Sequence, residues 1–339
     1  MKVALLTFLL ITQASALEKR TFDVYDIDVE GGKCVLAVSP SGESLLFDLG
    51  WPAFNGRDSD RIVTAAKAAG LKQIDYLVVS HYDLDHMGDV PLLMSKFPIK
   101  TLVDHGPVET SGKGAEQRYQ SYSAMFPKVN HLVVKPGDRI PIKGLDVLVI
   151  TAGGKWIDKP LKGAGKPNPL CATTPVKANR PEDQEDNSSI GLLFTSGNFR
   201  MLDLADFEWD YDHKLMCPNN PVGTVDAYQV SIHGQDKGVS PVLAQALHAR
   251  VALMGNGTRK GGAPATWETL KTAPGMEDIW QLHYSEAGGK EHNPPDDYIA
   301  NPQGTPIDEA HWLKLSAQPN GTFTVTNTRN NFTKTYNKR

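Results

Sequence analysis

SHYDLDHMG, at residues 80–88, directly follows the apolar run at residues 74–79. A run rich in Val, Leu and Tyr indicates a buried strand, so this stretch is expected on the loop at the strand end, where open α/β folds bind their ligands. It contains four candidate metal ligands, His81, Asp83, Asp85 and His86. Imidazoles and carboxylates together suit zinc or a similar divalent ion. A helix-capping turn needs only one such residue, so the spacing favours a metal site.

The same stretch resembles the H-x-H-x-D-H signature of the metallo-β-lactamase superfamily, with Asp83 in place of the usual second histidine. The resemblance implies that His81 and Asp83 face one metal ion, while Asp85 and His86 face the other. It also implies an α+β fold, the four-layer αββα sandwich of the metallo-β-lactamase type.

A segment before the metal loop extends this resemblance. Residues 45–50 are similar to the family's strand that ends in Asp-x-Gly, and its Asp48 would fix a metal-binding imidazole from outside the ligand set. The order and spacing of the motifs are most similar to a branch related to the hydrolase domain of bacterial DNA-uptake channel proteins. The similarity extends from about residue 21 to about residue 301.

Two later segments supply the remaining implied ligands. The strand that ends in the metal-bridging aspartate is matched by the segment that ends at Asp206, with Ala205 where glycine is usual. The strand that ends in His-His-Gly is matched by the segment that ends at Gly234, where Ile232 replaces the first histidine and leaves His233. The residues themselves leave alternatives open, because an aspartate can cap a following helix and a histidine can be an ordinary loop residue.

The third histidine of the first metal site is missing. The family places it where this sequence has only the acidic run at residues 182–187. A carboxylate such as Asp186 would make the first site rich in oxygen and shift its preference from zinc towards manganese or iron. A solvated acidic loop is the alternative.

The resemblance implies a hydrolase in which two divalent ions share a bridging carboxylate and activate a bound hydroxide. Zinc is the expected metal, with manganese or iron as alternatives at the first site. The implied metal ligands are His81, Asp83, Asp85, His86, Asp206 and His233. The candidate catalytic residues are Asp85, which would orient the hydroxide, and His105, which would bind substrate or protonate a leaving group. The departures at positions 83, 205 and 232 and the missing third histidine support a rival hypothesis, a degenerate, non-catalytic metal-binding or ligand-binding protein.

Composition favours one enzyme domain over residues 21–339. Of the 339 residues, 40% are hydrophobic, which is enough for a core, and no linker-like tract divides the chain. The net charge of -4 provides no basic field for a polyanion, so no nucleic-acid partner is expected. We expect a small-molecule substrate, namely an ester, lactone, lactam or phosphodiester. The sequence does not indicate an oligomeric state.

The N-terminus predicts secretion. Lys2, the apolar run at residues 3–11 and the small residues 14–16 fit a signal peptide over residues 1–16. That run is too short to span a bilayer, and no membrane anchor is expected. Residues 17–20 end in a dibasic pair and form a candidate propeptide.

Cysteines and sequons add two expectations for a secreted protein. The three cysteines allow one disulfide and one free thiol in any of three pairings: Cys34, Cys171 and Cys217. The sequons predict a glycoprotein and lie at Asn187, Asn256, Asn320 and Asn331. Because a glycan must point into solvent, Asn187 beside the expected ligand position should stay unmodified, while at least one other sequon is occupied.

Residue patterns also predict the elements around the loop. Strands are expected at residues 22–29, 34–38, 44–47 and 101–104, and helices at residues 59–69, 87–96, 242–249 and 265–272. Alternation near residues 311–315, 322–326 and 332–336 predicts a terminal meander. The irregular segment 155–185 is a candidate lid or wall of the substrate pocket. His283, at the end of a further strand, is expected to be structural.

Overall fold

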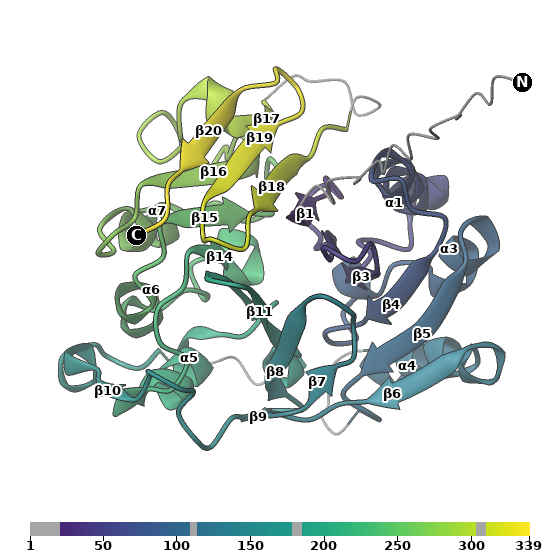
Figure 1. Ribbon diagram of the computed structural model, residues 1–339, viewed down its shortest axis with the longest axis horizontal. Coiled ribbons are helices and arrows are strands. Elements are labelled where there is room, and N and C mark those ends of the chain that lie inside the picture. The colour runs from purple at the N-terminus through teal and green to yellow at the C-terminus, as the bar shows by residue number, and fades with distance from the viewer. Residues whose placement is uncertain (1–20, 109–113, 178–184, 303–309) are drawn as a thin grey trace, which may run out of the picture.

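The computed structural model describes residues 21–108, 114–177, 185–302 and 310–339, which form a four-layer αββα sandwich (Figure 1). Two sheets pack face to face, and helices cover both outer faces, as the predicted fold class requires. The predicted signal peptide at residues 1–16 and propeptide at residues 17–20 lie outside the described residues. Within the described ranges, no helix is long and apolar enough to cross a membrane.

The first sheet has nine strands, which come from both the N-terminal and the C-terminal parts of the described chain. Its order is β20 (Thr333–Tyr336), β19 (Phe323–Asn327), β18 (Leu313–Ala317), β1 (Phe22–Asp26), β2 (Val35–Val38), β3 (Ser44–Phe47), β4 (Ile74–Val78), β5 (Ile99–Asp104) and β6 (Asn130–Val133). Strands β3 to β6 are parallel and end at one edge. The predicted C-terminal meander is confirmed, and it pairs through β18 with β1.

The second sheet also has nine strands. Its order is β17 (Ile299–Asn301), β16 (Asp278–His283), β15 (Val251–Met254), β14 (Ala227–Gln229), β12 (Phe199–Asp203), β11 (Gly191–Ser196), β8 (Asp146–Ala152) and β7 (Arg139–Ile140), with β9 (Lys155–Trp156) paired to β8. Strands β12, β14, β15, β16 and β17 are parallel. A separate pair joins β10 (Lys166–Pro167) to β13 (Asn219–Asn220).

Helices cover the outer face of each sheet (Figure 1). The first sheet is covered by α1 (Arg57–Ala68), α3 (Val90–Lys96) and α4 (Ala115–Ser123), and the second by α5 (Trp209–Met216), α6 (Pro241–Leu247) and α7 (Pro264–Lys271). The short helix α2 (Leu84–Met87) belongs to the predicted metal loop. Helix α1 ends as predicted, because Gly70 takes φ +75° and donates its N–H to Lys67 O.

The single helix predicted at residues 87–96 is wrong in one respect. The chain forms two helices there, α2 and α3, with a break at Gly88 and Asp89. Gly88 has φ +48°, and a Cβ at this position would lie 2.6 Å from atoms of Leu49. The close approach to Leu49 therefore requires glycine and separates the metal loop from α3.

Successive apolar side chains of each central strand point to opposite faces of its sheet, and together they fill three layers. Phe22 of β1 faces the layer between the sheets, where its ring centroid lies 5.8 Å from that of Phe194 in β11. Leu46 of β3 belongs to the layer beneath α1 and α3, and Leu202 of β12 to the layer beneath α5 and α6. The central strands are thus buried on both faces, which explains why they read as continuous apolar runs.

The disulfide joins Cys171 to Cys217, one of the three pairings that the sequence left open, and Cys34 is buried and free. It connects the segment after β10 to the end of α5. The segment predicted as a lid, residues 155–185, contains β9 and β10 in its described part, while residues 178–184 lie outside it. Its lid role stays a prediction.

Burial separates the four sequons into two groups. Asn187 is 3% exposed and Asn256 is 0% exposed, whereas Asn320 and Asn331 are exposed.

We predict glycan occupancy at Asn320 or Asn331 and none at Asn187 or Asn256 in protein secreted from a eukaryotic host, because a bulky glycan needs solvent. Glycopeptide mass spectrometry measures this, and substantial occupancy at Asn187 would contradict its buried position.

Candidate metal centre

The candidate residues gather where the parallel strands of the two sheets end, as expected for a ligand site in such folds. The loop with His81 and His86 follows β4, and Asp206 follows β12. His233 follows β14 in the 3-10 helix η6 (Ser231–Gly234), and Asp186 precedes β11 in η5 (Asp186–Ser188). Residues that are far apart in the sequence are therefore brought to one edge.

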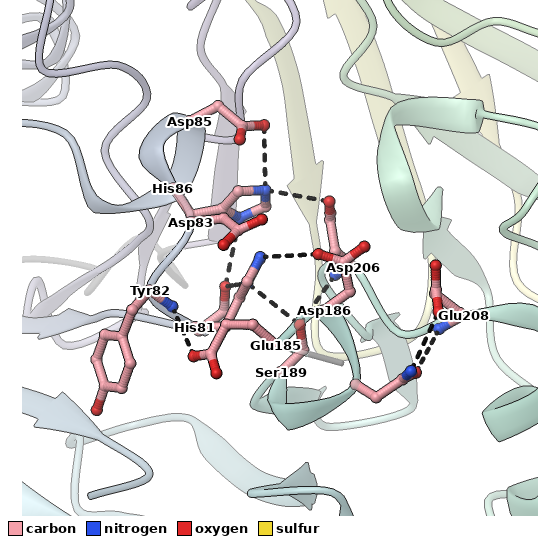
Figure 2. Close-up of polar contacts among 12 residues, drawn as sticks. His81, Tyr82, Asp83, Asp85, His86, Glu185, Asp186, Ser189, Asp206 and Glu208 are labelled. Carbon is pink, nitrogen blue, oxygen red and sulfur yellow. Dashed lines mark hydrogen bonds and ion pairs between the residues drawn. The ribbon is translucent and has the colours of Figure 1, made fainter. Parts of the chain in front are cut away.

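One group, called here the Asp206 cluster, has ligand atoms that all lie within 4.8 Å of one another and consists of Asp85, His86, Asp206 and His233. His86 Nε2 lies 3.4 Å from Asp85 Oδ2 and 3.3 Å from Asp206 Oδ2 (Figure 2). His233 Nε2 lies 3.1 Å and 3.4 Å from the same two oxygens. The structure thus brings together four of the residues predicted as ligands. The N-cap of α5 is Glu208, so Asp206 is not the cap of this helix.

The second group, the His81 cluster, meets the same 4.8 Å criterion and consists of His81, Asp83 and Asp186. His81 Nε2 lies 3.7 Å from Asp186 Oδ1 (Figure 2). Asp83 is partly exposed and lies 3.1 Å from Arg118 Nη2. Asp186 is therefore the carboxylate of the acidic run that lies beside His81, where the missing third histidine was expected. Residues 182–184 of that run lie outside the described residues.

Buried imidazole nitrogens indicate that the clusters are suited to metal ions. Nε2 of His81, of His86 and of His233 is buried without a hydrogen-bond partner among the described residues. Nearly all buried polar atoms in proteins are satisfied, and neutral imidazole nitrogen is a common metal ligand. Three such nitrogens beside carboxylates fit divalent ions, and the donor set suits zinc, manganese or iron.

The acidic and basic groups of the clusters shift one another's pKa. Burial would raise the pKa of Asp206, but the imidazoles of His86 and His233 hold it well below its usual range. Burial would lower the pKa of His86, but Asp206 and Asp85 raise it well above its usual range. Burial, together with the charge of Asp206, raises the pKa of Asp186 well above its usual range. The close carboxylates thus strengthen proton binding at His86 and Asp186, and a bound cation would take the place of those protons.

Asp48 orients His86 in the way that the sequence predicts. Its Oδ2 lies 2.9 Å from His86 Nδ1 and accepts a hydrogen bond from Ser80 Oγ at 2.7 Å, while its Oδ1 accepts one from Ser80 N at 2.7 Å. A carboxylate on Nδ1 favours the proton there and leaves Nε2 to face a metal. Asp48 itself has φ +63°, a conformation that is uncommon outside glycine.

Two of the departures from the family pattern lie in left-handed backbone. Ala205 has φ +51°, which explains why glycine suits this position, and Ile232 has φ +50°. Ile232 N donates to Ala205 O at 3.1 Å, so the two turns contact each other directly. This contact brings Asp206 and His233 side by side, and the strained backbone is typical of functional sites.

His105 lies outside both clusters, although its side chain is buried. Its Nε2 is 3.6 Å from Glu185 Oε1, and its ring centroid is 4.7 Å from that of Tyr82. The predicted catalytic role of His105 therefore stays a prediction. His283 Nε2 lies 2.7 Å from Asp28 Oδ1. Together with Glu30 these residues form a third group whose ligand atoms lie within 4.8 Å of one another, so the structural role expected of His283 stays a prediction.

Three residues at the site were not identified from the sequence. Ser189 Oγ lies 3.3 Å from His81 Nδ1 and accepts a hydrogen bond from Asp206 N at 3.3 Å. Lys237 contacts Asp186, and Lys260 contacts Asp85. No local motif marks these residues, because their contacts with His81, Asp186 and Asp85 join positions that are 108, 51 and 175 residues apart in the sequence.

Comparison with known proteins supports the fold. The family model of the metallo-beta-lactamase superfamily matches residues 27–158, and the chain has the fold of that superfamily. No curated protein matches the chain.

Several solved structures are similar at low sequence identity. The metallo-beta-lactamase fold protein YhfI from Bacillus subtilis is 14% identical with a TM-score of 0.45, and the match covers 77% of this chain and 96% of that one. Igni18, a metallo hydrolase from Ignicoccus hospitalis, is 12% identical with a TM-score of 0.43, covering 78% and 97%. CmlA, a diiron beta-hydroxylase from Streptomyces venezuelae, is 13% identical with a TM-score of 0.38, covering 75% and 47%.

Replacing Asp48 by Asn should weaken zinc binding by roughly tenfold to a hundredfold, the usual loss when the partner of a metal-binding imidazole is changed. Titration against a competing chelator measures the dissociation constant. Asp75→Asn is the matched control, because Asp75 is also buried and accepts the Ser44 N–H, but lies near the start of β4, away from the metal loop. Unchanged zinc affinity in D48N would remove Asp48 from the centre.

Proposed function

We propose that the protein is a metal-dependent hydrolase whose centre holds two divalent ions in the His81 and Asp206 clusters. The observation that carries the proposal is the set of three buried Nε2 atoms that face carboxylates without a hydrogen-bond partner among the described residues. The proposed ligands are His81, Asp83, Asp85, His86, Asp186, Asp206 and His233. Zinc is the expected metal, with manganese or iron as alternatives in the oxygen-rich His81 cluster.

The residues of the chain would divide the work in the following way. Divalent ions held by the two clusters would supply Lewis-acid chemistry, activating water as the nucleophile and polarising the substrate, so no protein nucleophile would be required. Asp85 orients the attacking group from the Asp206 cluster, and Asp48 holds the His86 ring in place. His105 stays the candidate proton donor to the leaving group, because imidazole is the side chain that most often serves as a general acid.

We further propose a secreted enzyme that acts on a small ester, lactone, lactam or phosphodiester. The apolar run at residues 3–11 supports secretion, and the disulfide is typical of oxidising compartments. The net charge of -4 disfavours nucleic acid as a substrate. The finer resemblance, to the hydrolase domain of DNA-uptake channel proteins, rests on motif order and spacing and stays a prediction.

The test is hydrolysis of a chromogenic panel that contains one ester, one lactone, one lactam and one phosphodiester. We expect turnover of at least one class, loss of turnover on removal of metal by a chelator, and recovery on addition of zinc or manganese. His86→Ala should lose at least one metal equivalent and abolish turnover. His292→Ala is the control, because His292 pairs with Glu268 outside both clusters.

Two outcomes would count against this function. Turnover that persists at full rate in metal-depleted protein would exclude a metal-dependent reaction. Stoichiometric metal binding with no turnover across the panel would favour the rival hypothesis, a non-catalytic metal-binding protein on the same fold.

A further inference from the structure

Each carboxylate of the two clusters contacts a cation or an imidazole of the chain itself. The pairs are Asp83 with Arg118, Asp186 with Lys237, Asp85 with Lys260, and Asp206 with His86 and His233. Lys260 contacts the carboxylate oxygen that faces the imidazoles of its cluster, whereas Lys237 contacts the oxygen that does not. That difference gives them opposite roles towards a metal ion.

Lys260 contacts the oxygen that faces the interior of the Asp206 cluster. Its Nζ contacts Asp85 Oδ2, the same oxygen that lies 3.4 Å from His86 Nε2 and 3.1 Å from His233 Nε2. The ammonium also lies 5.0 Å from the centroid of the Trp51 ring, which attracts a cation. Lys260 is therefore held where its charge acts directly on the oxygen that a metal ion would use.

Lys237 contacts the other oxygen of its carboxylate. Its Nζ lies 2.6 Å from Asp186 Oδ2, whereas His81 Nε2 faces Asp186 Oδ1 at 3.7 Å. Lys237 Nζ also lies 3.1 Å from Glu208 Oε1, and Glu208 Oε2 accepts a hydrogen bond from Asn187 Nδ2 at 3.1 Å. This network fixes the Asp186 carboxylate with Oδ1 towards His81 and leaves that oxygen to a metal ion.

We propose that Lys260 is a counter-cation that a metal ion must displace from Asp85, whereas Lys237 is a positioning residue that helps Asp186 to bind a metal ion. The inference rests on the proposed metal centre. Two positive charges on one carboxylate oxygen repel each other, so loss of Lys260 should strengthen metal binding. Loss of Lys237 should weaken it, because Asp186 loses the contact that orients it.

The test measures zinc dissociation constants by competition with a chromophoric chelator, in variants that retain one cluster. His81→Ala isolates the Asp206 cluster, and in this background Lys260→Met should bind zinc roughly fivefold more tightly, the upper range for a partly exposed ion pair. Lys260→Arg keeps the charge and should bind zinc with the affinity of the His81→Ala background.

His233→Ala isolates the His81 cluster, where Lys237→Met should bind zinc roughly fivefold more weakly.

A second readout follows the metal-free protein. Lys260→Met should lower its melting temperature while Lys260→Arg should not, because only the latter keeps the positive charge that residue 260 places against Asp85. Zinc binding that is unchanged or weaker in Lys260→Met would overturn the counter-cation role. Binding that is unchanged or tighter in Lys237→Met would overturn the positioning role. Failure of the unsubstituted protein to bind zinc would overturn the metal centre itself, and this inference with it.

Discussion

Charge balance at the edge where the strands of both sheets end is the constraint on which the site depends. The two clusters bring together carboxylates and imidazoles that are largely buried. An uncompensated charge in such a place costs several kcal/mol. Arg118, Lys237 and Lys260 compensate part of it from the rim. The Nε2 atoms of the three imidazoles face carboxylates without a hydrogen bond among the described residues, where divalent ions would complete the balance.

The sandwich makes this concentration of charge tolerable because its backbone holds the ligands rigidly. Asp48, Ala205 and Ile232 adopt left-handed conformations at or after strand ends, and each is buried. Such strain persists only where the surroundings determine the conformation. Here the closely packed layer between the sheets provides that support, so the ligands gain their geometry from the core rather than from one another.

The sequence predicted the features that depend on local pattern. The strand at residues 44–47, the end of α1 at Gly70 and the metal loop all follow from periodicity, turn chemistry or motif spacing. Asp186 was one candidate within an acidic run, because only the turn of η5 decides which carboxylate faces His81. The break at Gly88, the disulfide pairing and both lysines depend on contacts between distant segments, which no local pattern records.

The central claim is that the two clusters hold two divalent ions. Anomalous X-ray diffraction at the zinc absorption edge, from crystals grown with zinc, tests it most directly because it locates each ion. The account predicts two peaks per chain, one in contact with His86 and His233 and the other with His81 and Asp186. Fewer than two peaks at these clusters, or peaks only elsewhere, would contradict it.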